Sequence, residues 1–338
     1  MFHQDDLLAF TLANPTYADK ITHQLKWGCI YLEDTGILRI EPKQTTTISV
    51  VLSAGVHGNE TAPLELLNNI VREILQGRLV CRVRLLIIFG NPPASNLKQR
   101  FTDINMNRLF SGAWKEASGW EAQRAAQIEN TISDFFALQA TTQKLHYDLH
   151  TAIRGSKYTK FAVHPFIDEA IYDRQQLAFL TAADIEAVLL SHQPTTTLSY
   201  YSYKTHGAHA FTLELGRVAD FGKNDLSQLT SIDNALKILI SDSRLLEEKA
   251  NSLQIFQVID VLTKDEEDYR LNIADDTPNF TSFTKGDCLA QSSRSSYLIE
   301  ADGDALVFPN TKLPVGQRSG LVVRKVPLEL LTFNKNNN

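Results

Sequence analysis

The chain has 338 residues, of which 43% are hydrophobic and 21% charged, as in ordinary soluble globular proteins. The net charge of −6 argues against a nucleic-acid partner. No apolar run is long enough to cross a bilayer, and the N-terminal MFHQDDLLAF lacks the basic region of a secretory signal. The three cysteines, Cys29, Cys81 and Cys288, are odd in number and far apart. They predict no disulfide framework and no cysteine zinc cluster, and they fit a reducing, cytoplasmic compartment.

The first part of the chain alternates between predicted strands and helices. The β-branched run at 46–54 predicts a central strand, which the loop GVHGNE follows. Apolar spacing from Leu64 to Ile74 then predicts a helix that Thr61 caps and Gly77 ends. A second buried strand ends in the turn Gly90-Asn91-Pro92.

The polar segment 91–119 shows little periodicity, and a helix is predicted after it at 120–138. The remaining elements of this part are short strands and one long amphipathic helix, predicted at 145–149, 161–163, 211–215 and 226–246. This alternation predicts a layered α/β domain with a largely parallel or mixed sheet.

The pattern of predicted elements changes near residue 250. From there short β-rich runs are broken by Gly, Pro, Asp and Asn, which is typical of a small, mostly β domain. We therefore expect two domains, at 1–249 and 250–338.

Four residues at strand ends or in loops point to metal chemistry. His57 and Glu60 lie in GVHGNE, His150 ends the run YDLH, and Glu214 lies in FTLELG. Strand ends converge in open α/β sheets, so loops distant in sequence can meet there. Two histidines and one carboxylate form a catalytic zinc set with a fourth position left for water. Such a site needs a further carboxylate as general base, and Glu214 is the candidate.

Each of these residues also has an ordinary structural explanation. His57 beside a glycine suits a turn, Glu60 suits a helix N-terminus, and His150 can be a core histidine. Glu214 can pair with Arg217. The H-x-x-E spacing alone is a weak pattern, but all four residues in this order and context form a specific one.

The chain resembles the succinylglutamate desuccinylase/aspartoacylase family of the zinc carboxypeptidase superfamily. The matching motifs are AGVHGNETAP, GNPPASNLKQRF, NMNRLF, DLHT and TLELG, together with the tail DGDALVFPNTKLPVGQRSGLVV. The resemblance implies a zinc-carboxypeptidase-like α/β domain with a central mixed sheet and a small C-terminal β-rich domain. It implies one zinc ion per chain on His57, Glu60 and His150, with Glu214 as catalytic acid/base.

The resemblance also assigns roles in the polar segment. It implies that Arg100 polarises the scissile carbonyl and that Asn107 and Arg108 bind the α-carboxylate of the substrate. A planar guanidinium suits this because it can bind a carboxylate through two parallel hydrogen bonds. Without the resemblance, these would read as solvated loop charges. The family commonly has Asp where Asn105 stands, which questions an orienting salt bridge to Arg108 but leaves an amide that can form hydrogen bonds.

Tail motifs and length look more like the desuccinylase branch of the family. The expected reaction is hydrolysis of N-succinylglutamate to glutamate and succinate, the last step of arginine catabolism by the succinyl route. This small acylated amino acid has three carboxylates, so further cations are needed to bind it. Lys204 or Arg154 is expected to meet a second carboxylate, although both are equally plausible as surface charges.

Three other readings stay open. An aspartoacylase, or another N-acyl-amino-acid deacylase, would use the same metal set with a different acyl pocket. A true carboxypeptidase is disfavoured because the extra β domain should obstruct a peptide. A non-catalytic zinc-bound scaffold would need a fourth protein ligand, for which Asp148 and His146 are candidates. Oligomeric state and the identity of the metal in the cell are left undetermined.

Overall fold

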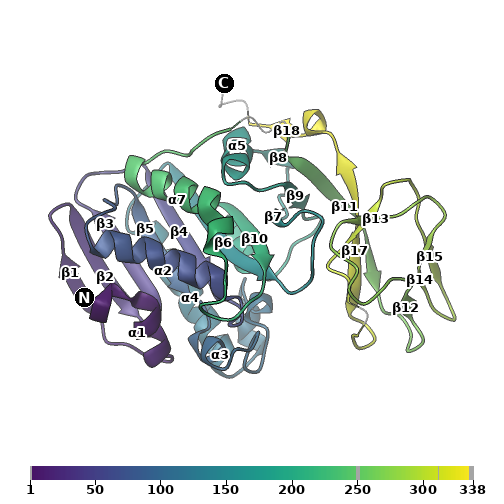
Figure 1. The fold of residues 1–338 in the computed structure, drawn as a ribbon, viewed down its shortest axis with the longest axis horizontal. Helices are drawn as coiled ribbons and strands as arrows, with labels where there is room; N and C mark the ends of the chain where they lie inside the picture. Colours follow the sequence, from purple (N-terminus) through teal and green to yellow (C-terminus); the bar gives the residue numbers. More distant parts are fainter. Residues whose placement is uncertain (1, 249–251, 311, 335–338) are drawn as a thin grey trace.

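The computed structural model describes residues 2–248, 252–310 and 312–334. Its centre is a twisted mixed sheet of 13 strands, which confirms the predicted α/β class (Figure 1). In sheet order these strands are β1 (Ile21–Gln24), β2 (Gly28–Asp34), β3 (Ile37–Pro42), β5 (Arg84–Phe89), β4 (Ile48–Ala54), β6 (Gln143–Ala152), β10 (His209–Arg217), β7 (Lys160–His164), β9 (Ala187–Leu190), β11 (Gln254–Thr263), β17 (Arg318–Val326), β16 (Ala305–Val307) and β13 (Thr281–Ser282).

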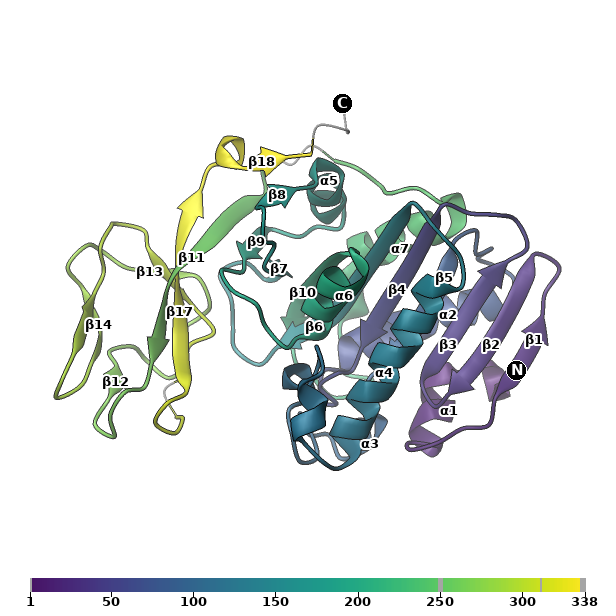
Figure 2. The same cartoon turned by 180° about the vertical axis from the view of Figure 1, so that it is seen from behind.

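Helices cover both faces of the sheet, as the two opposite views show (Figures 1 and 2). One face carries α1 (Leu7–Ala13), α2 (Thr61–Leu75), α5 (Arg174–Ala182) and α7 (Thr230–Asp242) over the largest apolar core. The other carries α4 (Trp120–Ala137) and α6 (Leu198–His206) over a second core. Because both faces of β4 are covered, all its residues are buried, as its unbroken β-branched run predicts.

The helix after the first motif forms as predicted, but its cap differs. Glu60 occupies the N-cap position of α2, and the hydroxyl of Thr61, already inside the helix, donates to the carbonyl of Ala219 at 2.7 Å. Gly77 ends the helix as expected, with a left-handed φ of 71°. The predicted helix 226–246 is shorter: it opens with the 3₁₀ turn Leu226–Leu229, and α7 ends where Ser243 adopts a left-handed φ of 55°.

The C-terminal β-rich segment extends the central sheet. β11 pairs in parallel with β9, with Gln254 opposite Ala187, and β17 pairs antiparallel with β11. The predicted domain boundary between 249 and 250 lies outside the described residues. Smaller sheets are formed by β12 (Arg270–Leu271), β14 (Cys288–Gln291) and β15 (Ser296–Leu298), and by β8 (Ile171–Tyr172) with β18 (Thr332–Phe333).

The polar segment after β5 is built from short turns. They are α3 (Pro92–Asn96) and the 3₁₀ turns Met106–Arg108 and Ala113–Glu116. Within the described ranges, all three cysteines are unpaired, and no helix combines the length and apolarity of a membrane span.

Candidate metal centre and active site

The loop after β4 carries the first two candidate ligands. It turns at Gly55, whose φ of +67° suits glycine, and it then packs against α3. A Cβ on Gly58 would lie 2.3 Å from backbone atoms of Ala94 and Ser95, so only glycine allows this approach. The close packing fixes His57 and Glu60 at the carboxyl edge of the sheet.

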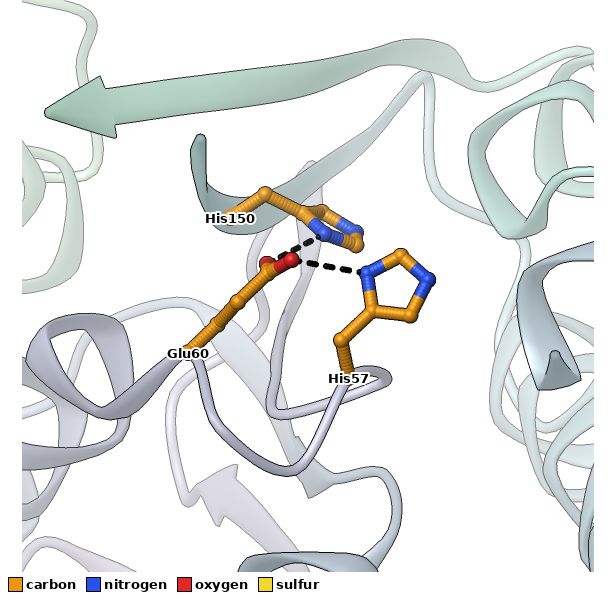
Figure 3. Close-up of side chains that lie close together, drawn as sticks. All are labelled: His57, Glu60 and His150. Carbon is orange, nitrogen blue, oxygen red and sulfur yellow. Dashed lines mark hydrogen bonds and ion pairs between the residues drawn. The ribbon is translucent and has the colours of Figure 1, made fainter. Parts of the chain in front are cut away.

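His57, Glu60 and His150 form one buried group (Figure 3). The Glu60 carboxylate lies between the two rings, with Oε1 2.9 Å from His57 Nδ1 and Oε2 2.8 Å from His150 Nδ1. One ligand atom from each residue lies within 4.8 Å of the others, so the group can hold a metal ion. The structure thus brings the three predicted ligands together.

The outer nitrogen of each ring has its own acceptor. His57 Nε2 lies 3.0 Å from Asn105 Oδ1, and His150 Nε2 lies 2.9 Å from Asp148 Oδ2. A proton on each Nε2, donated to these oxygens, leaves each Nδ1 free to bind a metal. The Oδ1 of Asn105 also accepts from the Asn107 backbone N–H at 3.1 Å. Asn105 therefore orients His57, a role that the sequence did not indicate.

A buried chain of hydrogen bonds continues behind His150. His146, Asp148 and His150 alternate along β6, so their side chains lie on one face of the sheet. Ser53 Oγ donates to Asp148 Oδ1 at 2.6 Å and lies 2.9 Å from His146 Nε2. His146 Nδ1 lies 2.6 Å from Ser202 Oγ. Asp148 and His146 thus support His150 from behind, and neither completes a closed four-ligand metal site.

The charges of the group suit a bound cation. Burial alone would raise the pKa of Glu60, yet the two histidines hold that pKa well below its ordinary value. Burial alone would lower the pKa of His150, yet Asp148 and Glu60 hold it well above its ordinary value. Without a metal, the site therefore stabilises a positive charge on His150.

Glu214 lies beside this group on the neighbouring strand. In the parallel pairing of β10 with β6, Glu214 is opposite His150. Leu213 and Leu215 pack into the larger core, so Glu214 points to the other face, where His150 also lies. Its Oε2 is buried and has no hydrogen-bond partner among the described residues. Burial, and then repulsion from Glu60, raise the pKa of Glu214 to about 7, so it can exchange a proton near neutral pH.

The segment after β5 brings Arg100 to the same place. Arg100 donates to Glu60 Oε1 at 2.7 Å. Glu121 of α4 holds the segment by accepting from the Thr102 backbone N–H at 2.6 Å. Asn107 is buried and accepts from the Leu198 backbone N–H at 3.0 Å, at the start of α6.

Arg108, the next residue, is exposed. Burial, followed by repulsion from Arg318 and Arg100, lowers its pKa to about 10.

The structure does not bring Lys204 to this group. α6 runs antiparallel to β10, since Ser199 contacts Thr212 while Ser202 contacts His146, which is level with Ala210. The step from Ala210 to Glu214 is roughly 13 Å at about 3.3 Å per residue. Lys204 lies farther still along α6, where it is exposed and pairs with Asp168 at 3.0 Å. This placement disfavours Lys204 as the second carboxylate-binding residue, and the contact expected of Lys204 or Arg154 stays a prediction.

Arg154 lies just beyond the carboxyl end of β6, on the side of the site. One of its guanidinium nitrogens donates to the carbonyl of Asp275 and, at 3.0 Å, to that of Thr277. Arg154 therefore ties the C-terminal β segment to the site edge, and a second role in carboxylate binding stays a prediction.

Comparisons with known proteins agree with this site. The model of the succinylglutamate desuccinylase/aspartoacylase catalytic domain matches residues 46–240, and the model of the AstE/AspA barrel-sandwich hybrid domain matches residues 251–326. The chain belongs to this family. A succinylglutamate desuccinylase of Pseudoalteromonas atlantica is 44% identical over 301 residues, covering 87% of this chain and 86% of its own length.

Solved structures agree as well. The succinylglutamate desuccinylase of Chromobacterium violaceum superimposes with a TM-score of 0.86 at 36% identity, covering 97% of this chain and 99% of its own. The Vibrio parahaemolyticus protein of the same name gives 0.89 at 34% identity, with 97% of both chains covered. These matches confirm the predicted fold class, the mixed-sheet domain with its additional C-terminal β domain.

Proposed function

We propose that this chain hydrolyses N-succinyl-L-glutamate to L-glutamate and succinate, using one zinc ion on His57, Glu60 and His150. The observation that carries the proposal is the buried histidine–carboxylate–histidine group with the unpartnered Glu214 carboxylate beside it. The substrate follows from relatives of 36% and 44% identity that bear the name succinylglutamate desuccinylase and match most of the chain.

The donor set supports zinc. Two imidazole nitrogens and one carboxylate are a common catalytic zinc set, and each ring is oriented by an acceptor on its outer nitrogen. Bound there, zinc would polarise the scissile carbonyl and lower the pKa of a water molecule to about 7.

The side chains around the metal group supply the acid/base, oxyanion-binding and carboxylate-binding groups of the reaction. Glu214 takes a proton from the water that attacks the succinyl amide carbonyl, and the C–N bond breaks as Glu214 returns that proton to the leaving amine of glutamate. Arg100 donates a hydrogen bond to the oxygen that gains negative charge. Asn107 and Arg108 hold the α-carboxylate, which fixes the amide over the site.

We further propose that 1–249 carries the chemistry while 250–338 narrows the cleft and excludes long peptides. The reaction would be cytoplasmic and would end arginine catabolism by the succinyl route. The contact between Arg154 and the carbonyls of Asp275 and Thr277 supports a cleft closed from the C-terminal side.

The test compares N-succinyl-L-glutamate with N-acetyl-L-aspartate, using zinc-loaded and chelated protein. We expect cleavage of the first substrate alone, with loss of activity on chelation and recovery with added zinc. Preferential cleavage of N-acetyl-L-aspartate would instead assign the chain to aspartoacylase activity. Turnover that survives complete removal of the metal would refute the zinc mechanism.

A further inference from the structure

A buried carboxylate lies beside the segment that carries Arg100. Glu121, in the first turn of α4, is only 1% exposed. Its Oε1 accepts from the backbone N–H of Thr102 at 2.6 Å and from that of Asp103 at 3.3 Å. The hydroxyl of Thr102 and, at 3.3 Å, the side-chain amide of Asn91 donate to the same oxygen. Four donors from two other parts of the chain thus converge on one atom.

Neutral groups stabilise the charge of this carboxylate. Burial alone would raise the pKa of Glu121, yet hydrogen bonds from Thr102 and Asn91 hold that pKa below its ordinary value. An acid that served only the positive end of a helix could lie in water. Burying a carboxylate is costly unless hydrogen bonds satisfy it, so Glu121 and its donors hold one another in place.

The same contacts close a ring around the backbone of Arg100. The carbonyl of Arg100 accepts at 3.0 Å from the backbone N–H of Gly58, in the loop that carries the first two metal ligands. Gly58 packs on the backbone of α3, and Asn91 is the N-cap of that helix. Asn91 in turn donates to Glu121, which holds Thr102. The metal-ligand loop therefore fixes the backbone at Arg100, and Glu121 fixes it two residues later.

The other end of this segment has an anchor of its own. Asn107 accepts from the backbone N–H of Leu198 at 3.0 Å, and its own backbone N–H donates to Asn105 at 3.1 Å. These contacts hold Asn105 and Asn107 without Glu121. Loss of Glu121 should therefore affect Arg100 more than the orientation of the first metal ligand or the residues assigned to the α-carboxylate.

We propose that Glu121 is a positioning residue that fixes the guanidinium of Arg100 at the scissile carbonyl. This rests on the proposed function, in which Arg100 donates to the oxygen that gains negative charge. The side chain of Arg100 contacts Glu60 at 2.7 Å but is 34% exposed. A long side chain that is partly open to water has several rotamers available, so its backbone must be held if the guanidinium is to occupy one place.

The test measures kcat and KM of zinc-loaded Glu121→Ala on N-succinyl-L-glutamate. We expect kcat to fall roughly 10- to 100-fold, because a small displacement of a catalytic group has an effect of this size. KM should change less than about threefold. In an Arg100→Ala background the same substitution should change kcat less than about threefold, since the group that Glu121 positions is absent. Glu121→Gln keeps an acceptor oxygen and should recover most of the loss.

Glu129→Ala is the matched control. Glu129 lies about two turns further along α4 and is also buried. It holds a different turn, accepting from the backbone N–H of Gly112 at 3.2 Å and from Trp114 Nε1 at 2.8 Å. Its loss should lower Tm and change kcat less than about threefold.

Thr102→Ala provides the test if Glu121→Ala does not fold. It removes the hydroxyl donor and keeps the backbone N–H of Thr102. We expect a smaller fall in kcat, about 3- to 10-fold, which disappears in the Arg100→Ala background. A wild-type kcat in this variant would refute the proposal.

Three outcomes with Glu121→Ala would also overturn it. They are a kcat near wild type, an equal fall in kcat with and without Arg100, and a fall no larger than that in Glu129→Ala. The first would mean that Arg100 needs no such anchor. The second would mean that Glu121 acts on another group, and the third that any loosening of α4 lowers activity.

Hydrogen exchange keeps this proposal separate from the proposed function. If wild type does not cleave N-succinyl-L-glutamate, the proposed function fails, and the kinetic comparison moves to N-acetyl-L-aspartate. With either substrate, or with neither cleaved, the amides of Thr102 and Asp103 should exchange faster in Glu121→Ala than in wild type, because their buried acceptor is gone. Exchange at the wild-type rate would refute the anchoring role of Glu121.

Discussion

The variant Glu214→Gln tests two properties of this residue in separate measurements: its raised pKa and its role as the catalytic acid/base. In the metal-free protein, burial and Glu60 raise the pKa of Glu214 from 4.5 to about 7. Below pH 4.5 the carboxyl is protonated in both folded and unfolded protein, so its ionisation costs nothing. As pH rises to 7, the unfolded state loses the proton first, and the folded state loses stability. At about 1.36 kcal/mol per pH unit, the full loss is about 3 kcal/mol above pH 7.

The glutamine variant has no such titration. Its buried amide adds a cost that does not depend on pH, so the informative quantity is the change in the stability difference between variant and wild type. From pH 5 to pH 8 this difference should shift by about 2 to 3 kcal/mol in favour of the variant. Urea unfolding of chelated proteins at both pH values measures it. Zinc-loaded Glu214→Gln should keep its metal and lose orders of magnitude in kcat. A stability difference that stays constant with pH would refute the raised pKa, and near-normal turnover would remove Glu214 from catalysis.

Three other substitutions test how the metal group is held. Asn105→Ala removes the acceptor on His57 Nε2, and we expect roughly 10- to 100-fold weaker zinc binding in competition with a chromophoric chelator; an unchanged affinity would contradict the orienting role. Gly58→Ala would place a methyl 2.3 Å from the backbone of α3, so both Tm and zinc content should fall, and a variant with wild-type values would show that the loop can move. Ser53→Ala removes a donor to the buried Asp148, and the free energy of unfolding in urea should fall by about 1–3 kcal/mol. A smaller change than that would mean that water replaces the hydroxyl.

The metal group was predictable because it depends on local patterns. His57 and Glu60 directly follow an unmistakable buried strand, and His150 and Glu214 lie in further strands whose carboxyl ends meet at one edge. The partners of these residues were harder to predict. Asn105 contacts His57 only because a segment with little periodicity folds beside the metal group. The family commonly has Asp at this position, and that resemblance suggested a contact with Arg108 instead.

The residues that bind the substrate were harder to predict from the sequence than the metal group, for a geometric reason. Lys204 was expected near the site, but the helix α6 that carries it was not predicted. That helix runs antiparallel to β10, so Lys204 lies away from Glu214. The C-terminal β segment joins the sheet because β11 pairs with β9 and β17 returns along β11. Neither pairing has a signature in residue spacing.

The distribution of charge accounts for how one substrate can be oriented in this site. Acidic groups collect around the metal group, where Glu60, Asp148 and Glu214 face two histidines. Arg100 lies at the edge of the group, where it donates to Glu60 Oε1, and Arg108 follows in the same segment of the chain. A ligand with several carboxylates is repelled from the first region and attracted to the second, so its neutral amide is the part that can enter the metal group. On this reasoning a protein with a net charge of −6 can still hold an anionic substrate, because arginines of the segment after β5 lie at the edge of the site.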